Sequence, residues 1–213
     1  MNLPRPAELQ AFEQLQLDKK AIGVWVDPID GTAEYITGNR DPEFKPGENI
    51  SQNGLPNVTV LVGVYEKATG QPLIGVINQP FFSYRRWKVK LGTYLCESFE
   101  ILTAPGAGYK LLCVIDRLCS AYVLSKDNTY RWDTCAPHAI LKALGGGVVQ
   151  FKGLLASDLS PGKRDQSLRE QQITYHKSEP KANGSNAWCN AQGVIAYYDQ
   201  EVLLALAEHL SRK

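Results

Sequence analysis

Apolar side chains recur along the chain with two different periods, which predict strands in some segments and helices in others. Runs rich in β-branched residues predict strands over residues 22–26, 58–65, 73–77, 84–96, 121–124, 148–151, 173–176 and 193–198. Apolar residues three and four apart predict helices over residues 109–115, 133–144 and 199–210. Residues 38–56, rich in Gly, Asn and Pro, and the charged residues 157–171 are expected to be loops. Strands joined by hairpins and followed by helices indicate a layered α/β protein.

The length of 213 residues fits one large domain, and 44% of the residues are hydrophobic, so the chain can bury a sizeable core. We divide this domain into three parts. Residues 1–21 are an atypical, partly helical lead-in, residues 22–96 hold the first acidic motif and hairpin strands, and residues 106–213 form a C-terminal α/β half.

The near-zero net charge argues against two classes of binding partner, nucleic acids and anionic membranes. With 23 basic and 22 acidic residues the net charge is +1, which provides no field suited to nucleic acid or to an anionic membrane. No apolar run approaches the roughly 20 residues that span a bilayer. We therefore expect a small-molecule ligand held by a local site, with no nucleic-acid partner and no membrane insertion.

The cysteines argue against a zinc site or a disulfide framework. They are odd in number, scattered, and form no Cys-x-x-Cys pair. They are Cys96, Cys113, Cys119, Cys135 and Cys189. Because the first 20 residues are also unlike a secretory signal, we expect a soluble protein of a reducing compartment, the cytoplasm.

Residues 27–32 (DPIDGT) directly follow the first predicted strand and carry the first candidate chemistry. Asp27 and Asp30 are so close in sequence that their carboxylates repel one another unless a cation lies between them. Mg²⁺ prefers oxygen ligands, and the backbone carbonyl of Ile29 is placed to add another oxygen. The simpler alternative is a proline-containing turn with two solvated aspartates.

Residues 131–137 (RWDTCAP) supply a third carboxylate, Asp133, which we expect at the N-cap of the helix over 133–144. Taken alone, an ordinary cap that contributes about 1 kcal/mol is the simpler interpretation. A helix N-terminus also favours phosphate, and an aspartate there can share the cation that neutralises it.

Residues 106–110 (GAGYK) place small residues at the start of another predicted helix. Backbone N–H groups there can receive an oxyanion, and Lys110 can add a positive charge. The alternative is a turn followed by a solvated lysine.

In combination, residues 27–32 and 132–137 resemble the paired motifs of the inositol monophosphatase superfamily. The likeness extends from about residue 22 to 198, through residues 23–27, 58–65, 75–81, 106–110, 138–141, 145–147, 174–176 and 193–197. It is greatest with the branch that acts on inositol polyphosphates. This resemblance implies a magnesium-dependent, lithium-sensitive phosphomonoesterase with a fructose-1,6-bisphosphatase-like layered α+β sandwich.

By resemblance, the magnesium ligands are Asp27, the carbonyl of Ile29, Asp30 and Asp133. Asp27 and Thr32 are the expected catalytic residues, and the Thr32 hydroxyl helps to orient the attacking water. The implied reaction is metal-assisted hydrolysis without a covalent enzyme intermediate.

The resemblance also implies how substrate is held. Gly31 and Thr32 contact the scissile phosphate, whereas Gly106, Ala107 and Lys110 face the inositol ring and its remaining phosphate. The expected reaction removes the 1-phosphate of inositol 1,4-bisphosphate and inositol 1,3,4-trisphosphate in phosphatidylinositol signalling.

Two features depart from the family pattern. The family has a further glutamate ligand and an acidic partner for the threonine, and nothing in residues 1–21 replaces them, since Glu8 and Glu13 lack the expected neighbours. The chain also passes directly from residues 94–97 to 106–108, where the family has a longer segment. We therefore expect a truncated site with weak magnesium binding and slow turnover.

Two rival functions stay open. A 3′(2′),5′-bisphosphate nucleotidase shares both acidic motifs, although residues 65–70 and 106–110 favour the inositol branch. A non-catalytic remnant that binds a metal or a partner is the rival of a different class, and the missing ligands support it.

Overall fold

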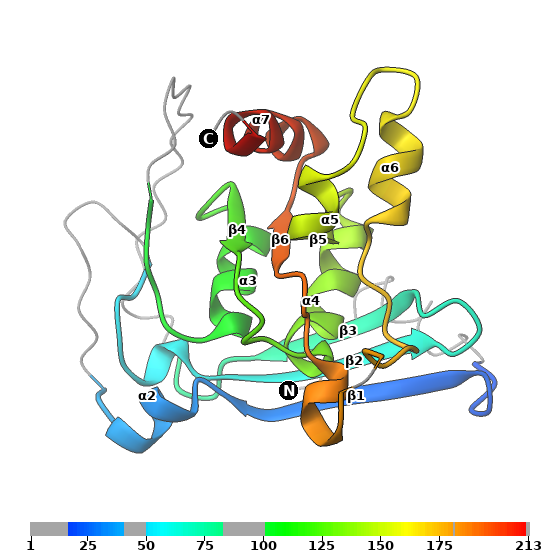
Figure 1. The fold of residues 1–213 in the computed structure, drawn as a ribbon. Coiled ribbons are helices and arrows are strands. Elements are labelled where there is room, and N and C mark those ends of the chain that lie inside the picture. The colour runs from blue at the N-terminus through cyan, green and yellow to red at the C-terminus, as the bar shows by residue number, and fades with distance from the viewer. Residues whose placement is uncertain (1–16, 41–49, 83–100, 181, 212–213) are drawn as a thin grey trace, which may run out of the picture.

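Two small antiparallel sheets lie on either side of one central helix in the computed structural model of the chain (Figure 1). The structure describes residues 17–40, 50–82, 101–180 and 182–211. The strands are β1 (Ile22–Asp30), β2 (Thr59–Glu66), β3 (Pro72–Asn78), β4 (Ala121–Leu124), β5 (Gly147–Gln150) and β6 (Val194–Tyr197). The helices are α2 (Thr32–Thr37), α3 (Ala107–Ile115), α4 (Arg131–Ala143), α5 (Phe151–Leu155), α6 (Arg164–Glu170) and α7 (Gln200–Ser211), with the 3₁₀ turns η1 (Leu55–Asn57) and η3 (Gly184–Trp188).

The first sheet has the order β1-β2-β3, and α4 covers one of its faces. The helix lies close because glycines stand beneath it. A Cβ atom at Gly63 would lie 2.6 Å from the backbone nitrogen of Ala136, and one at Gly75 would lie 2.0 Å from the Ala136 carbonyl oxygen. The backbone of α4 therefore rests almost directly on β2 and β3, which fixes the second turn of α4 against the sheet.

No described element covers the opposite face of this sheet (Figure 1). Cross-strand pairing arranges its β-branched side chains in rows, one of Val24, Val64 and Ile74 and another of Val26, Val62 and Val76. Val24, Val26 and Val76 are each about half exposed, at 52%, 50% and 53%. We call these six side chains the open valine face.

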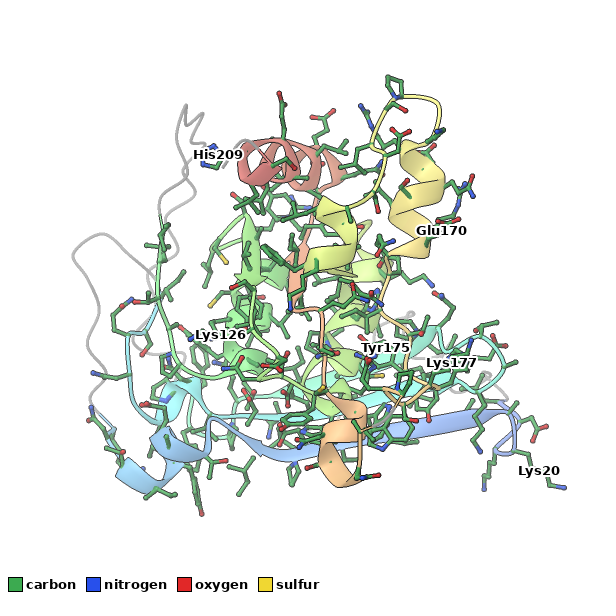
Figure 2. The ribbon with its side chains drawn as sticks, in the orientation of Figure 1. Lys20, Lys126, Glu170, Tyr175, Lys177 and His209 are labelled. Atoms are coloured by element: carbon green, nitrogen blue, oxygen red, sulfur yellow. The ribbon has the colours of Figure 1, made fainter. Side chains whose placement is uncertain are left out.

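The second sheet has the order β4-β6-β5, and its central strand β6 is completely buried. One apolar cluster joins this sheet to α3 and α4, and another joins it to α5 and α7. Tyr175 is fully buried, whereas charged side chains such as Lys20, Glu170 and Lys177 are exposed (Figure 2). No helix among the described residues combines the length and apolar character needed to cross a membrane.

The structure differs from the predicted elements at four places. Residues 32–37 and 151–155 form the unexpected helices α2 and α5, and the predicted loop 157–171 contains helix α6. Residues 173–176 form no strand, because Ile173 N–H donates to Val148 and Tyr175 N–H donates to Gly70, so no ladder with one partner develops. The predicted strand over 84–96 and the candidates Glu8 and Glu13 lie outside the described residues.

Candidate active site

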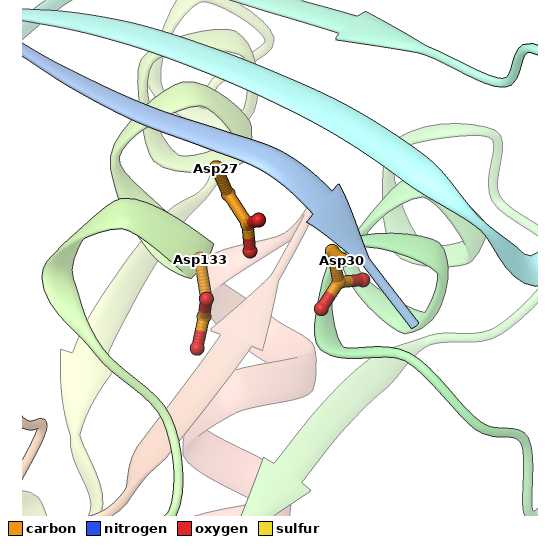
Figure 3. Close-up of side chains that lie close together, drawn as sticks. All are labelled: Asp27, Asp30 and Asp133. Atoms are coloured by element: carbon orange, nitrogen blue, oxygen red, sulfur yellow. The ribbon is translucent and has the colours of Figure 1, made fainter. Parts of the chain in front are cut away.

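Three carboxylates from two distant parts of the chain meet between the first sheet and the start of α4. One oxygen atom from each of Asp27, Asp30 and Asp133 lies within 4.8 Å of the others. Their side chains point toward a common space, two from β1 and one from α4 (Figure 3). The sequence prediction that these three residues form one acidic site is thus matched by the geometry.

A bulge in β1 brings Asp27 and Asp30 to the same side of the sheet. Asp27 pairs with Leu61 and Asp30 pairs with Thr59, so three steps along β1 correspond to two along β2. Without the extra residue, positions three apart would point to opposite faces. Pro28, which has no N–H to donate to the ladder, lies inside this irregular stretch. Ile29 N–H donates to Asp27 Oδ1 at 3.1 Å and helps to hold that carboxylate.

Asp30 is seated against the start of α3. Its carboxylate accepts hydrogen bonds from Gly108 N–H at 2.8 Å, Ala107 N–H at 3.3 Å and the Thr59 hydroxyl at 3.2 Å. Burial raises the pKa of Asp30, and the charge of Asp27 adds to this effect, although the three hydrogen bonds oppose it. The sequence interpretation that N–H groups at this helix start receive an oxyanion of the substrate stays a prediction; in the structure the N–H groups of Ala107 and Gly108 donate to Asp30.

Asp133 occupies the third position of α4, and the expectation of an N-cap is therefore wrong. The helix begins earlier because Tyr130 is its N-cap, and Asp133 Oδ2 accepts from the backbone N–H of Tyr130 at 2.8 Å. Burial raises the pKa of Asp133 to about 8, and the negative charges of Asp30 and Asp27 act in the same direction. The carboxylate is 7% exposed, so little water is present to stabilise its charge.

These properties fit a hard divalent cation. Three close carboxylates, two of them with raised pKa values, form a region where negative charge is poorly compensated by the protein alone. All donors are oxygen atoms, which suits Mg²⁺ better than softer metals that prefer sulfur or imidazole. No other group of three potential ligands was found among the described residues.

Three further residues that the sequence assigns to the site, Ile29, Gly31 and Thr32, lie at the junction of β1 and α2. Gly31 is the N-cap of α2 with φ of 81°, a conformation that favours glycine. The Thr32 hydroxyl is exposed and donates to the carbonyl oxygen of Ile29 at 3.0 Å. The contacts expected of Gly31 and Thr32 with phosphate, and of the Ile29 carbonyl with metal, stay predictions.

Lys110 lies close to the acidic cluster but also contacts a residue that the sequence did not indicate. Its Nζ atom is 5.0 Å from the ring centroid of Tyr122, in β4. Burial lowers the pKa of Lys110, and the charge of Asp30 opposes that shift. Burial raises the pKa of Tyr122, as do the charges of Asp133 and Asp30. Tyr122 was missed because it lies in an apolar run without a recognisable motif.

The sequence profile described as the inositol monophosphatase family matches residues 6–105 and 93–200. The chain belongs to the inositol monophosphatase family. A phosphatase of the same family, the inositol polyphosphate 1-phosphatase of Bos taurus, is 35% identical over 263 aligned positions that cover 93% of this chain and 64% of the relative. The 3′(2′),5′-bisphosphate nucleotidase 1 of Rattus norvegicus is 30% identical over 70% of this chain and 55% of that relative.

The chain spans about three fifths of the inositol polyphosphate 1-phosphatases that it matches. Among solved structures, an inositol monophosphatase from Zymomonas mobilis superposes with a TM-score of 0.52 at 16% identity, covering 90% of this chain and 71% of that protein. The α/β architecture expected from the sequence is thereby confirmed as the fold of the inositol monophosphatase family.

Proposed function

We propose that the chain is a magnesium-dependent phosphomonoesterase that removes the 1-phosphate of inositol polyphosphates, such as inositol 1,4-bisphosphate and inositol 1,3,4-trisphosphate, in the cytoplasm. The convergence of Asp27, Asp30 and Asp133 within 4.8 Å carries this proposal. The likeness to inositol polyphosphate 1-phosphatases supports the choice of substrate.

Each group of the site has a chemical task in this proposal. The three aspartates would hold the cation, which when bound would supply Lewis-acid stabilisation of phosphate charge and a nucleophilic water at neutral pH. The Thr32 hydroxyl, now donating to the Ile29 carbonyl, orients the attacking water, and Gly31 lies against the scissile phosphate. The family resemblance further supports inhibition by Li⁺.

Replacement of one charged ligand at a time tests the metal assignment. Asp27→Asn and Asp133→Asn keep the shape of the side chain but remove its charge, so phosphate release from inositol 1,4-bisphosphate should fall at least about a hundredfold. The exposed Asp165→Asn provides a matched control that should retain turnover. Near-normal turnover of either site variant at saturating Mg²⁺ would contradict the assignment.

A bisphosphate nucleotidase is the second candidate, supported by the similarity to the nucleotidase of Rattus norvegicus. The ratio of kcat/KM for inositol 1,4-bisphosphate to that for adenosine 3′,5′-bisphosphate separates the two functions. A ratio well above one supports the inositol substrate, and a ratio below one supports the nucleotide. Calorimetric magnesium binding without turnover of either compound would identify a non-catalytic remnant.

A further inference from the structure

The contact between Lys110 and Tyr122 joins α3 to the edge strand of the second sheet beside the acidic cluster. The ammonium group lies 5.0 Å from the ring centroid, within the range of a cation–π interaction. Tyr122 is 7% exposed and packs in the apolar cluster with Leu111, Val114 and Cys135, so its ring is held in place by the core.

The position of Lys110 reflects a balance between two attractions. The negative charge of Asp30 attracts the ammonium group, and so does the face of the Tyr122 ring, whose centroid lies 5.0 Å from Nζ. The structure contains no ion pair between Lys110 and Asp30 among the described residues. An ammonium that closed onto Asp30 would neutralise a carboxylate that the cation requires, and it would be unavailable to substrate.

We propose that Tyr122 is a positioning residue whose ring holds the ammonium group of Lys110 away from Asp30 and ready to receive the second, non-reacting phosphate of a bisphosphorylated substrate. This inference rests on the proposed function and assigns a residue that determines specificity within the same site. The ring strengthens substrate binding only when the substrate carries a second phosphate, because in this proposal only that phosphate contacts Lys110. Its loss therefore weakens binding of a bisphosphate while leaving that of a monophosphate unchanged.

Fluorination of the ring at position 122 tests this role without the risk of a core cavity. The series replaces Tyr122 by phenylalanine and then by its 4-fluoro, 3,5-difluoro and 3,4,5-trifluoro analogues. The ring stays in place throughout, but each added fluorine weakens its attraction for a cation. The readout is the calorimetric Kd of the full chain with Mg²⁺ for the non-hydrolysable 1-phosphonate analogues of inositol 1,4-bisphosphate and inositol 1-phosphate, which are called the bisphosphate and the monophosphate below. From phenylalanine to the trifluoro analogue, the bisphosphate Kd should rise about threefold to tenfold.

Two controls separate this effect from general perturbation. Lys110→Met should make the bisphosphate Kd insensitive to fluorination, because the cation is gone. Arg117 and Tyr198 form a similar contact at 5.3 Å near the other end of α3, and the same fluorinated series at position 198 should leave both Kd values unchanged.

The outcomes distinguish the two levels of the proposal. If the parent chain with Mg²⁺ binds neither inositol phosphate, the proposed function fails. If the parent binds the bisphosphate but its Kd stays flat across the series at position 122, the role of the ring is overturned. If Tyr122→Phe alone already raises the bisphosphate Kd as much as Tyr122→Leu, the hydroxyl and not the ring face is responsible, and the proposal is again wrong.

Discussion

At the scale of single residues, the protonation of Asp133 links the stability of the folded chain to the binding of a cation at the acidic site. An aspartate in an unfolded chain ionises near pH 3.9, whereas burial and the neighbouring aspartates raise the pKa of folded Asp133 to about 8. Between these values the folded chain binds a proton that the unfolded chain has lost. The contribution of Asp133 to the free energy of unfolding is therefore fully present below about pH 3.9 and declines as the pH rises toward 8.

We predict that the metal-free chain loses about 1–2 kcal/mol of unfolding free energy between pH 6.5 and 8 through Asp133. Buried His138, whose pKa is lowered to about 3, opposes this decline only weakly in that window, because most of its effect on stability is gained below pH 6.5. Urea unfolding at several pH values measures the change. Asp133→Asn should flatten the profile, and an equally steep decline in that variant would assign it to other groups.

Added Mg²⁺ should reverse the trend, because the cation binds the ionised carboxylate and must displace its proton. The stabilisation by a fixed Mg²⁺ concentration is therefore expected to grow from pH 6.5 to 8. The release of protons during a calorimetric titration, compared in two buffers with different ionisation enthalpies, provides an independent measurement. An uptake of protons would contradict the assigned pKa shift.

At the scale of elements, the first turn of α3 is built around the Asp30 carboxylate. A Cβ atom at Gly108 would lie 2.3 Å from the Thr59 hydroxyl oxygen and 3.0 Å from Asp30 Oδ2, so the helix approaches β1 and β2 only because this residue lacks a side chain. The position of the Asp30 carboxylate and the position of the first turn of α3 consequently depend on one another. A displacement of either one displaces the other.

Gly108→Ala should therefore destabilise the chain by about 1–3 kcal/mol and weaken Mg²⁺ binding as Asp30 shifts. Gly162→Ala is the matched control, because a Cβ atom there meets nothing within 4 Å. Thermal unfolding and a magnesium titration on both variants check the expectation. A Gly108→Ala chain with unchanged magnesium affinity would show that Asp30 does not depend on this contact.

Elements with a regular period were predictable, and those defined by tertiary contacts were not. Residues 121–124 and 109–115 were predicted within two residues of β4 and α3 because their apolar patterns are continuous. Helix α2 is only six residues long, has no buried residue, and lies between glycines with positive φ, so it leaves no apolar stripe in the sequence. Ile173 and Tyr175 are fully buried without belonging to a strand, which explains why their apolar alternation was misleading.

The close pair Asp27 and Asp30 indicated a cation site from the residues alone, whereas the meeting of Asp133 with this pair was predictable only through the family resemblance. Asp27 and Asp133 are far apart in the sequence, and no local period indicates that they meet. The bulge between Asp27 and Asp30 also leaves no hydrophobic pattern, although Pro28 in the middle of the segment is a hint of irregular pairing. Thr59 is identified as a partner of Asp30 only by the pairing of β1 with β2, and Tyr122 as a partner of Lys110 only by the packing of α3 against β4.

At the scale of the whole molecule, the open valine face determines how the chain behaves as its concentration rises. Six aliphatic side chains in two rows form an apolar surface, and exposed apolar surfaces favour association of one molecule with another. We predict that the chain forms reversible dimers or larger species whose apparent mass in sedimentation increases with loading concentration. A fluorescent dye that binds apolar surfaces should bind it even when it is fully folded.

Val26→Lys places a charge at one end of a row of that surface and should weaken association roughly tenfold. Val123→Lys, at an exposed position of the second sheet, provides the matched control. Equal association of the two variants would place the contact elsewhere. The practical consequence is a solubility limit set by the face of the sheet opposite to the one that carries the Asp27 carboxylate.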